Sequence, residues 1–199
     1  MMDRQLGSVV PDPHADKAKV RAGILARRAE MSESDLANAD ALRTARALTE
    51  LKKLSPSVVA CYVSYGTEPG TLDLLAELAD WGVEVLLPWM GAGVEVPMWA
   101  PWSGEPMVPG PHSIPMPASS PLVGDVLAHA DVVILPGLAG TKTGIRLGRG
   151  GGWYDRALSG VTCPRWLLLN DCEVLGTLPQ DPWDQPVTTL ITDHRRIAC

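Results

Sequence analysis

The run Val132-Val-Ile-Leu135, between Asp131 and Pro136, is apolar at every position. Successive side chains of a strand point to opposite faces, so an unbroken apolar run of this length indicates a strand that is buried on both faces. Such strands lie in parallel sheets whose two faces are covered by helices. The run therefore predicts an α/β fold of three layers, with a mostly parallel central sheet and helices on both of its faces.

The chain before this run contains the pattern of a parallel βαβ unit. Residues 58–63 are largely β-branched, residues 72–81 have helical spacing, and residues 83–87 are again strand-like. This order of strand, helix and strand is typical of a parallel sheet. Many of the 18 prolines lie between positions 88 and 121. Because proline cannot donate to a sheet ladder, we expect edge strands and long loops there, over a cleft.

The chain after the run contains the remaining elements. A short helix is predicted over residues 153–158, and strands are predicted over residues 165–169 and 187–192. No repeat of fixed period is present. These segments complete one sheet rather than a second domain.

The N-terminal region predicts a flexible leader over residues 1–16, ahead of a single domain over residues 17–199. Asp16 is a candidate N-cap for a first helix that extends to Met31. A second helix follows, with Ser34 as its candidate cap.

Composition excludes several classes of protein. Seventeen Lys and Arg against 23 Asp and Glu give a net charge of −6, so the chain has no overall positive field, and we expect neither nucleic acid nor a membrane surface as a partner. Hydrophobic residues make up 46% of the chain, which is too many for a disordered protein. The four cysteines show no CxxC spacing, and no apolar signal stretch is visible, which favours a reducing, cytoplasmic location. The sequence contains no pattern that indicates an oligomeric state, and we expect a monomer or a weak homodimer.

The segment Gly144-Ile-Arg-Leu-Gly-Arg-Gly-Gly-Gly-Trp-Tyr-Asp-Arg156 carries the strongest functional signal. Its glycines leave backbone N–H groups unshielded, and such amides ahead of a helix form a concave anion site. Arg146 and Arg149 add forked donors that suit phosphate, and Asp155 is a candidate ligand for Mg²⁺. The spacing matches neither the P-loop nor the dinucleotide fingerprint. The alternative is a flexible glycine turn, which does not need two arginines.

Two further groups of residues are candidates. Lys17, Arg21 and Arg28 lie on one face of the first helix, beside its apolar stripe, which favours a role facing a cleft over a solvated basic face. Glu68 lies in the loop 64–71, between a predicted strand and a helix that Thr71 is placed to cap. Ligands bind at this edge of open α/β sheets, although a lone loop glutamate is often merely exposed.

These stretches, in this order, resemble the 5-formyltetrahydrofolate cyclo-ligase family, also called 5,10-methenyltetrahydrofolate synthetases. The resemblance runs from about Lys17 to the C-terminus. It rests on Lys17 with Arg21, on Ser64 to Thr71, on Leu135-Pro-Gly-Leu138 leading to Arg146-Leu-Gly-Arg-Gly-Gly-Gly-Trp-Tyr-Asp-Arg156, and on Asp181-Pro-Trp-Asp184 with Ile191-Thr-Asp193.

The resemblance implies ring closure of 5-formyltetrahydrofolate to the 5,10-methenyl form, driven by ATP with Mg²⁺. ADP and phosphate are released. Arg149 and Glu68 are then the expected catalytic residues, Asp155 and Asp184 the expected Mg²⁺ ligands, and Val63, Glu68 and Trp153 the expected folate contacts. The implied ATP contacts are Lys17, Arg21, Arg146, Gly148, Arg149, Gly150, Gly151, Gly152, Trp153 and Tyr154.

The chain departs from the family pattern at four places. Trp153 replaces the first tyrosine of an aromatic pair, Gly140-Thr141 replaces Phe-Asp, and Thr188 replaces an aspartate. His112 lies where some members place an aromatic residue. These changes leave open a catalytically inactive nucleotide- or folate-binding module of the same fold. A third interpretation is a sugar-phosphate isomerase or acyl-CoA enzyme that uses the anion loop without ATP.

Overall fold

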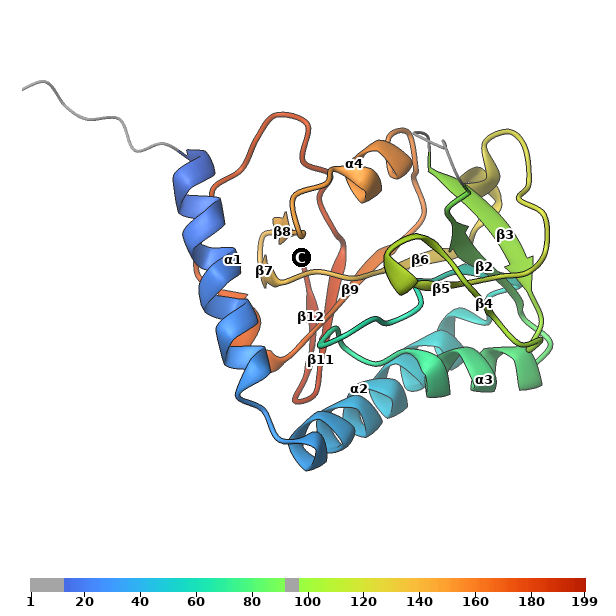
Figure 1. The fold of residues 1–199 in the computed structure, drawn as a ribbon, viewed down its shortest axis with the longest axis horizontal. Helices are drawn as coiled ribbons and strands as arrows, with labels where there is room; N and C mark the ends of the chain where they lie inside the picture. Colours follow the sequence, from blue (N-terminus) through green and yellow to red (C-terminus); the bar gives the residue numbers. More distant parts are fainter. Residues whose placement is uncertain (1–12, 92–96) are drawn as a thin grey trace, which may run out of the picture.

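The computed structural model describes residues 13–91 and 97–199; most of the predicted leader, residues 1–12, and the side chain of His112 lie outside this description. Within the described residues, the main sheet has the order β12-β11-β9-β6-β1-β2-β3 (Figure 1). β6 lies in the middle, as the apolar run predicts. The bounds are β1 Val58–Ala60, β2 Glu84–Trp89, β3 Met98–Trp102, β6 Val132–Leu135, β9 Arg165–Leu169, β11 Thr189–Thr192 and β12 Arg196–Ala198.

The inner strands of this sheet are parallel. β1, α3 (Leu72–Asp80) and β2 form the predicted βαβ unit, with Val58 paired to Glu84 and Ala60 paired to Leu86. β3 and β12 pair antiparallel at the two edges. The proline-rich segment supplies β3 and a two-stranded sheet made by β4 (Val108–Pro109) and β5 (Pro115–Met116), which confirms the prediction of edge strands there.

Helices cover both faces of the sheet. α2 (Glu33–Leu54) and α3 lie on one face (Figure 1). Leu51, Leu74 and Leu78 of these helices are fully buried against strand residues. Each such leucine stabilises the fold by about 1.5–3 kcal/mol relative to an exposed one. The opposite face is covered by η2 (Val126–His129) and α4 (Trp153–Ala157). Leu158, the C-cap residue of α4, packs in the apolar cluster on that face. The predicted α/β class with three layers is confirmed.

α1 (Pro13–Ala29) packs beside a small sheet rather than on the main one. This sheet has the order β10-β7-β8, with β10 Val174–Leu175, β7 Ala139–Thr141 and β8 Arg146–Leu147. Val20 of α1 packs against the buried cluster of Ala139 and Leu147. The packing brings α1 next to the strand from which the glycine-rich segment begins.

Both helix starts differ from the prediction. α1 begins at Pro13, so the prediction of Asp16 as its N-cap is wrong. Proline is well suited to the first turn because its missing N–H would have no partner there, and Asp16 lies in that turn with its charge favourable to the helix dipole. α2 is capped by Ser32, whose Oγ accepts a hydrogen bond from Asp35 N at 3.1 Å; the predicted cap Ser34 is wrong and lies inside the helix.

Two strands are shorter than their apolar runs. β1 ends at Ala60, although Tyr62 and Val63 beyond it are 2% and 5% exposed. β11 begins at Thr189, while the N–H of Val187 donates to Gly144 O at 2.8 Å instead of joining the sheet. The apolar pattern therefore predicted burial better than strand ends. In the two described ranges, no helix has the length and apolar character needed to cross a bilayer.

Candidate active site

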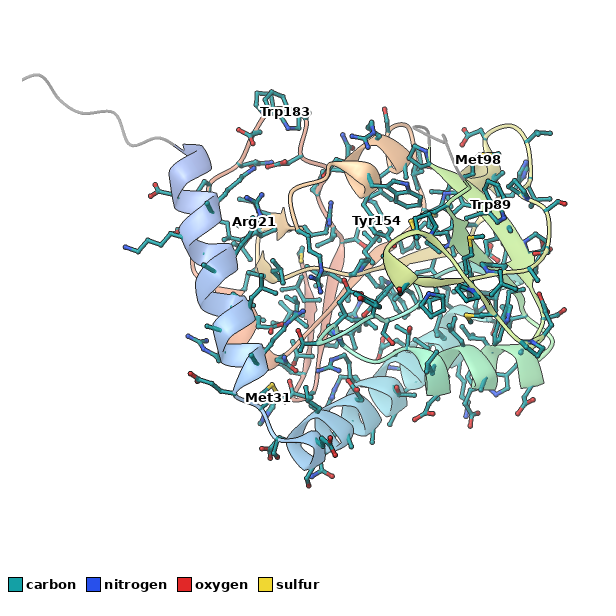
Figure 2. All side chains as sticks on the ribbon, viewed as in Figure 1. Arg21, Met31, Trp89, Met98, Tyr154 and Trp183 are labelled. Carbon is teal, nitrogen blue, oxygen red and sulfur yellow. The ribbon has the colours of Figure 1, made fainter. Side chains whose placement is uncertain are left out.

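A cavity of about 780 Å³ lies at the carboxyl ends of the central strands. Tyr62 and Val63, which follow β1, line it together with Pro136 and Gly137, which follow β6. This is the edge at which open α/β sheets bind ligands. With the exception of Arg28, the candidate site residues named from the sequence line this cavity: Lys17, Arg21, Val63, Glu68, Arg146, Gly148, Arg149, Gly150, Gly151, Gly152, Trp153, Tyr154, Asp155 and Asp184. Figure 2 shows Arg21, Tyr154 and Trp183 reaching this region from separate segments of the chain.

The glycine-rich loop forms one wall of the cavity. Gly150 and Gly152 have φ values of 107° and 64°, in the left-handed region that residues with a Cβ rarely adopt. Within residues 13–91 and 97–199, no group accepts a hydrogen bond from the backbone N–H groups of residues 148–152. α4 has only five residues, so the anion site predicted from the sequence would depend on the loop amides more than on a helix dipole.

Lys17 and Arg21 extend from α1 to this wall. Arg21 Nε donates to Gly148 O at 2.9 Å. Lys17 is 4% exposed, and its Nζ lies 2.7 Å from Asp181 Oδ2 and 2.6 Å from Asp184 Oδ2. Burial lowers the pKa of Lys17, but its hydrogen bonds and charge interactions with Asp181 and Asp184 raise the pKa above its usual value. Lys17 therefore stays a cation in the cavity.

Arg28 does not line the cavity, contrary to the prediction that it faces the cleft with Lys17 and Arg21. It is 1% exposed and forms a bidentate ion pair with Glu173, with Nε–Oε1 at 2.6 Å and Nη2–Oε2 at 2.7 Å. Its Nη2 also donates to Gly137 O at 2.8 Å. Arg28 thus holds the backbone at Gly137, which lines the cavity.

Arg146 and Asp155 form a second charged group in the wall. Arg146 Nη2 donates to Asp155 Oδ1 at 2.8 Å, and the guanidinium carbon lies 5.8 Å from the centroid of the Tyr154 ring. The N–H of Gln185 approaches the same Asp155 oxygen at 3.3 Å, which places the neighbouring Asp184 in the same part of the cavity. The two candidate metal ligands therefore line the same cavity, and the residue after Asp184 contacts Asp155.

The donor set fits Mg²⁺ bound together with a nucleotide. Among the described residues, no group of three or more His, Cys, Asp or Glu forms a metal site. Mg²⁺ usually binds through one or two carboxylates plus waters and substrate phosphates, so a complete cage of protein ligands is not required. Asp155 and Asp184 bring two carboxylates to the cavity lining, where each pairs with a cation, Arg146 and Lys17 respectively.

Arg149 and Glu68 meet across the cavity. Arg149 Nε lies 3.0 Å from Glu68 Oε1, and their side chains are 48% and 13% exposed. Glu68 Oε2 also accepts a hydrogen bond from Tyr65 N at 3.2 Å. This ion pair joins the glycine-rich loop to the loop that follows β1.

The loop 64–71 is closed at its base by reciprocal hydrogen bonds. Ser64 N donates to Thr71 Oγ1 at 3.0 Å, and Thr71 N donates to Ser64 Oγ at 3.1 Å. Tyr62 Oη donates to Pro69 O at 2.6 Å, and burial raises the pKa of that phenol well above its usual value. Thr71 is the N-cap residue of α3, but its hydroxyl makes no cap hydrogen bond and donates to Tyr62 O instead. Thr71 therefore occupies the predicted N-cap position, but its side chain does not cap the helix.

Two aromatic rings, those of Trp153 and Tyr154, line the cavity, and Trp99 packs against both of them. Trp153 and Tyr154 have ring centroids 4.8 Å apart, and Trp99 of β3 lies 5.5 Å from Trp153. Burial raises the pKa of Tyr154 well above its usual value, so this phenol stays neutral. The replacement at position 153 is accommodated by packing against Trp99.

Two other departures from the family pattern lie away from the cavity. Thr141 is 1% exposed and accepts a hydrogen bond from Ile145 N at 3.1 Å within a turn. Thr188 Oγ1 accepts one from Arg165 N at 3.0 Å at the start of β9. Neither side chain lines the cavity.

Sequence reasoning missed several lining residues. Asp181 binds Lys17 and donates its N–H to Asp184 Oδ2 at 2.8 Å; its place three residues before Asp184 is a usable signal. Tyr62 and Trp183 also line the cavity. Tyr62 lies in an apolar run that indicates only a strand, and Trp183 was given no role although it lies in the motif 181–184.

A family model described as the 5-formyltetrahydrofolate cyclo-ligase family matches residues 13–193. The chain is also 34% identical over 189 residues to the 5-formyltetrahydrofolate cyclo-ligase of Mycolicibacterium smegmatis, covering 92% of this chain and 96% of the relative. The chain belongs to this family. The resemblance inferred from the motifs is therefore confirmed, and with it the prediction of an enzyme of the ligase class.

A shorter sequence match and two solved structures are consistent with this family assignment. The cyclo-ligase of Escherichia coli is 37% identical over 73 residues, which cover 35% of this chain and 40% of that one. The structure of the Aquifex aeolicus 5,10-methenyltetrahydrofolate synthetase superposes with a TM-score of 0.76 at 24% identity, covering 92% of each chain. The Mycoplasma pneumoniae synthetase has a TM-score of 0.72 at 20% identity, covering 89% of this chain and 99% of that one. At these identities the two structures establish the shared fold alone.

Proposed function

We propose that this member of the cyclo-ligase family converts 5-formyltetrahydrofolate to 5,10-methenyltetrahydrofolate, with hydrolysis of ATP to ADP and phosphate. The observation that carries the proposal is the contact of Arg149 with Glu68 at 3.0 Å. It joins a loop built for phosphate to a loop that faces the remainder of the same cavity. A phosphoryl donor and a second substrate can therefore meet in one site.

The reaction needs activation of a formamide oxygen, which is a poor leaving group. Transfer of the γ-phosphoryl group to this oxygen gives an iminium phosphate and ADP. N10 then attacks the formyl carbon and loses its proton. The C–O bond breaks with its electron pair leaving on phosphate, and the methenyl bridge remains as a cation. Such a sequence depends on alignment and charge stabilisation rather than on a protein nucleophile.

The phosphate side of the cavity has the residues for the first step. The amides of residues 148–152 would bind phosphate oxygens, and Lys17, Arg21 and Arg146 would bind the charge of the triphosphate. Trp153 and Tyr154 would provide apolar contact beside them. Arg149 would neutralise charge on the transferred group, since its fork suits phosphoryl oxygens.

Mg²⁺ would be held by Asp155 and Asp184, where it would neutralise phosphate charge. On the folate side, Val63 and Trp153 would contact the pterin, and Glu68 would orient it or the attacking nitrogen. When ATP binds, the Arg149 guanidinium would leave its ion pair with Glu68 and bind phosphate oxygens instead.

The test is direct mixing of the protein with ATP, Mg²⁺ and 5-formyltetrahydrofolate, followed by absorbance of the methenyl product. Appearance of the chromophore with ADP formed in equal amount supports the proposal. Saturable ATP binding without chromophore would instead identify an inactive binding module. The control is the same mixture without ATP, which should give no chromophore.

A further inference from the structure

We infer that Asp40, on α2, is a positioning residue for Glu68. This inference rests on the proposed function, because it explains how the loop 64–71 presents its carboxylate to the cavity. Asp40 does not line the cavity. It acts through the backbone of Gly70, two residues beyond Glu68.

Asp40 ties the loop to the helix. Its Oδ1 accepts hydrogen bonds from Gly70 N at 2.8 Å and from Arg43 Nη1 at 2.5 Å. Gly70 is in close contact with this carboxylate, because a Cβ added at Gly70 would overlap the Asp40 side chain. The backbone at Gly70 is not in the left-handed region, so space is what requires a glycine here.

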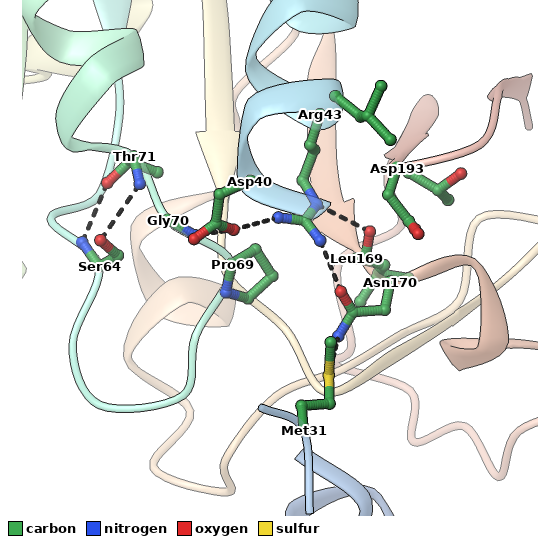
Figure 3. A network of polar contacts seen from close by, with 12 residues as sticks. Met31, Asp40, Arg43, Ser64, Pro69, Gly70, Thr71, Leu169, Asn170 and Asp193 are labelled. Carbon is green, nitrogen blue, oxygen red and sulfur yellow. Dashed lines mark hydrogen bonds and ion pairs between the residues drawn. The ribbon is translucent and has the colours of Figure 1, made fainter. Parts of the chain in front are cut away.

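Arg43 anchors Asp40 to the main sheet. It is 1% exposed, its Nε donates to Leu169 O at 2.9 Å, and its Nη2 donates to Asn170 Oδ1 at 2.6 Å (Figure 3). Leu169 is the last residue of β9, which is two strands from β1. A charged hydrogen bond to a buried guanidinium is strong and directional, so Asp40 has a fixed place relative to the carboxyl edge of the sheet.

Apart from the ion pair of Glu68 with Arg149, the remaining contacts of the loop do not replace this one. Ser64 with Thr71 closes its base, and Tyr62 holds Pro69 O. These contacts connect the loop to its own flanking residues, whereas Asp40 connects it to α2 and, through Arg43, to β9. The direction in which the loop leans over the cavity, and with it the position of Glu68, is therefore set by Asp40.

Gly70→Ala is the first test, because it displaces the loop from Asp40 and leaves the ion pair with Arg43 intact. A displacement of about 1 Å at a reacting group costs up to about 100-fold, so we expect kcat/KM for 5-formyltetrahydrofolate to fall about 10-fold or more. The KM for ATP should change less than about twofold. Gly176→Ala is the matched control, since a Cβ there meets open space.

Asp40→Ala and Asp40→Asn form the second test. Asp40→Ala should cause the same selective loss, and Asp40→Asn, which keeps an oxygen acceptor for Gly70, should restore most of the activity. Glu50→Ala is the control on the same helix, because Glu50 pairs with Lys53 and Arg196 away from the loop. Hydrogen exchange at the amide of Gly70 should rise in Asp40→Ala and not in Glu50→Ala.

The inference is overturned if Gly70→Ala keeps wild-type kinetic constants for the folate. It is also overturned if both substrates are affected equally in Gly70→Ala, or if Asp40→Asn is as impaired as Asp40→Ala. A wild-type protein without turnover would refute the proposed function instead. In that case the thermal shift given by 5-formyltetrahydrofolate still tests the inference: it should weaken in Gly70→Ala, and an unchanged shift contradicts it.

Discussion

Removing the guanidinium of Arg149 should impair catalysis without impairing folding. The Arg149 side chain is 48% exposed, and its ion pair with Glu68 is open to solvent on that side. Exposed pairs of this kind stabilise proteins by about 0–1 kcal/mol, so Arg149→Ala should leave the unfolding free energy nearly unchanged. A preorganised charge directed at a transition state contributes more: its loss lowers kcat about 10²-fold, or about 2.7 kcal/mol of activation free energy.

The assay is the initial rate of methenyl chromophore formation at saturating ATP and folate, with urea denaturation of the same preparations. Arg149→Lys keeps the charge but not the fork, and should recover only part of the rate. Glu68→Ala should also lower kcat about 10²-fold, and the double variant should lose less than the product of the single losses, because the two side chains are in contact. A loss below about threefold in Arg149→Ala, or equal losses of rate and stability, would refute the reasoning.

Three further predictions concern the charges, the thiols and the metal. Folding raises the pKa of Lys17 above its usual value of 10.5, so its ion pairs with Asp181 and Asp184 stabilise the fold fully below that pH. This contribution is lost as the pH rises through the pKa of the folded state. The difference in unfolding free energy between wild type and Lys17→Met should therefore shrink above pH 10.5, and a constant difference would count against the ion pairs. Burial raises the pKa of Cys61 to about 12. Iodoacetamide should therefore label the exposed Cys172 and leave Cys61 unmodified, which mass spectrometry of the labelled protein would show. Labelling of both cysteines at equal rates would contradict the burial of Cys61. Chelation with EDTA should abolish turnover and added Mg²⁺ should restore it, whereas an unchanged rate would exclude the metal assignment.

The sequence predicted the centre of the fold because a strand buried on both faces has an uninterrupted apolar sequence. The apolar run at 132–135 identified β6 as the central strand, and the glycine-rich segment identified one wall of the cavity. Strand ends were less predictable: Val187 is apolar and buried, yet its N–H donates to Gly144 O rather than to a neighbouring strand. Hydrophobicity reports burial and carries no information on which partner accepts the hydrogen bond.

Buried charges were the least predictable feature. Arg28 lies near Lys17 on the helical wheel, but only the fold shows that Glu173 meets Arg28 and that Asp181 meets Lys17. Arg43 reads as part of a polar helix face, although it is 1% exposed and holds the end of β9. These pairings join residues more than 100 positions apart, which spacing along one chain does not encode.

The central claim is that the formyl oxygen accepts the γ-phosphoryl group in this cavity. It is tested most directly with 5-formyltetrahydrofolate carrying ¹⁸O in the formyl group, with the released phosphate analysed by mass spectrometry after one turnover. The account predicts one ¹⁸O atom in each phosphate formed, since the C–O bond breaks with oxygen leaving on phosphorus. Methenyl product accompanied by unlabelled phosphate would contradict it.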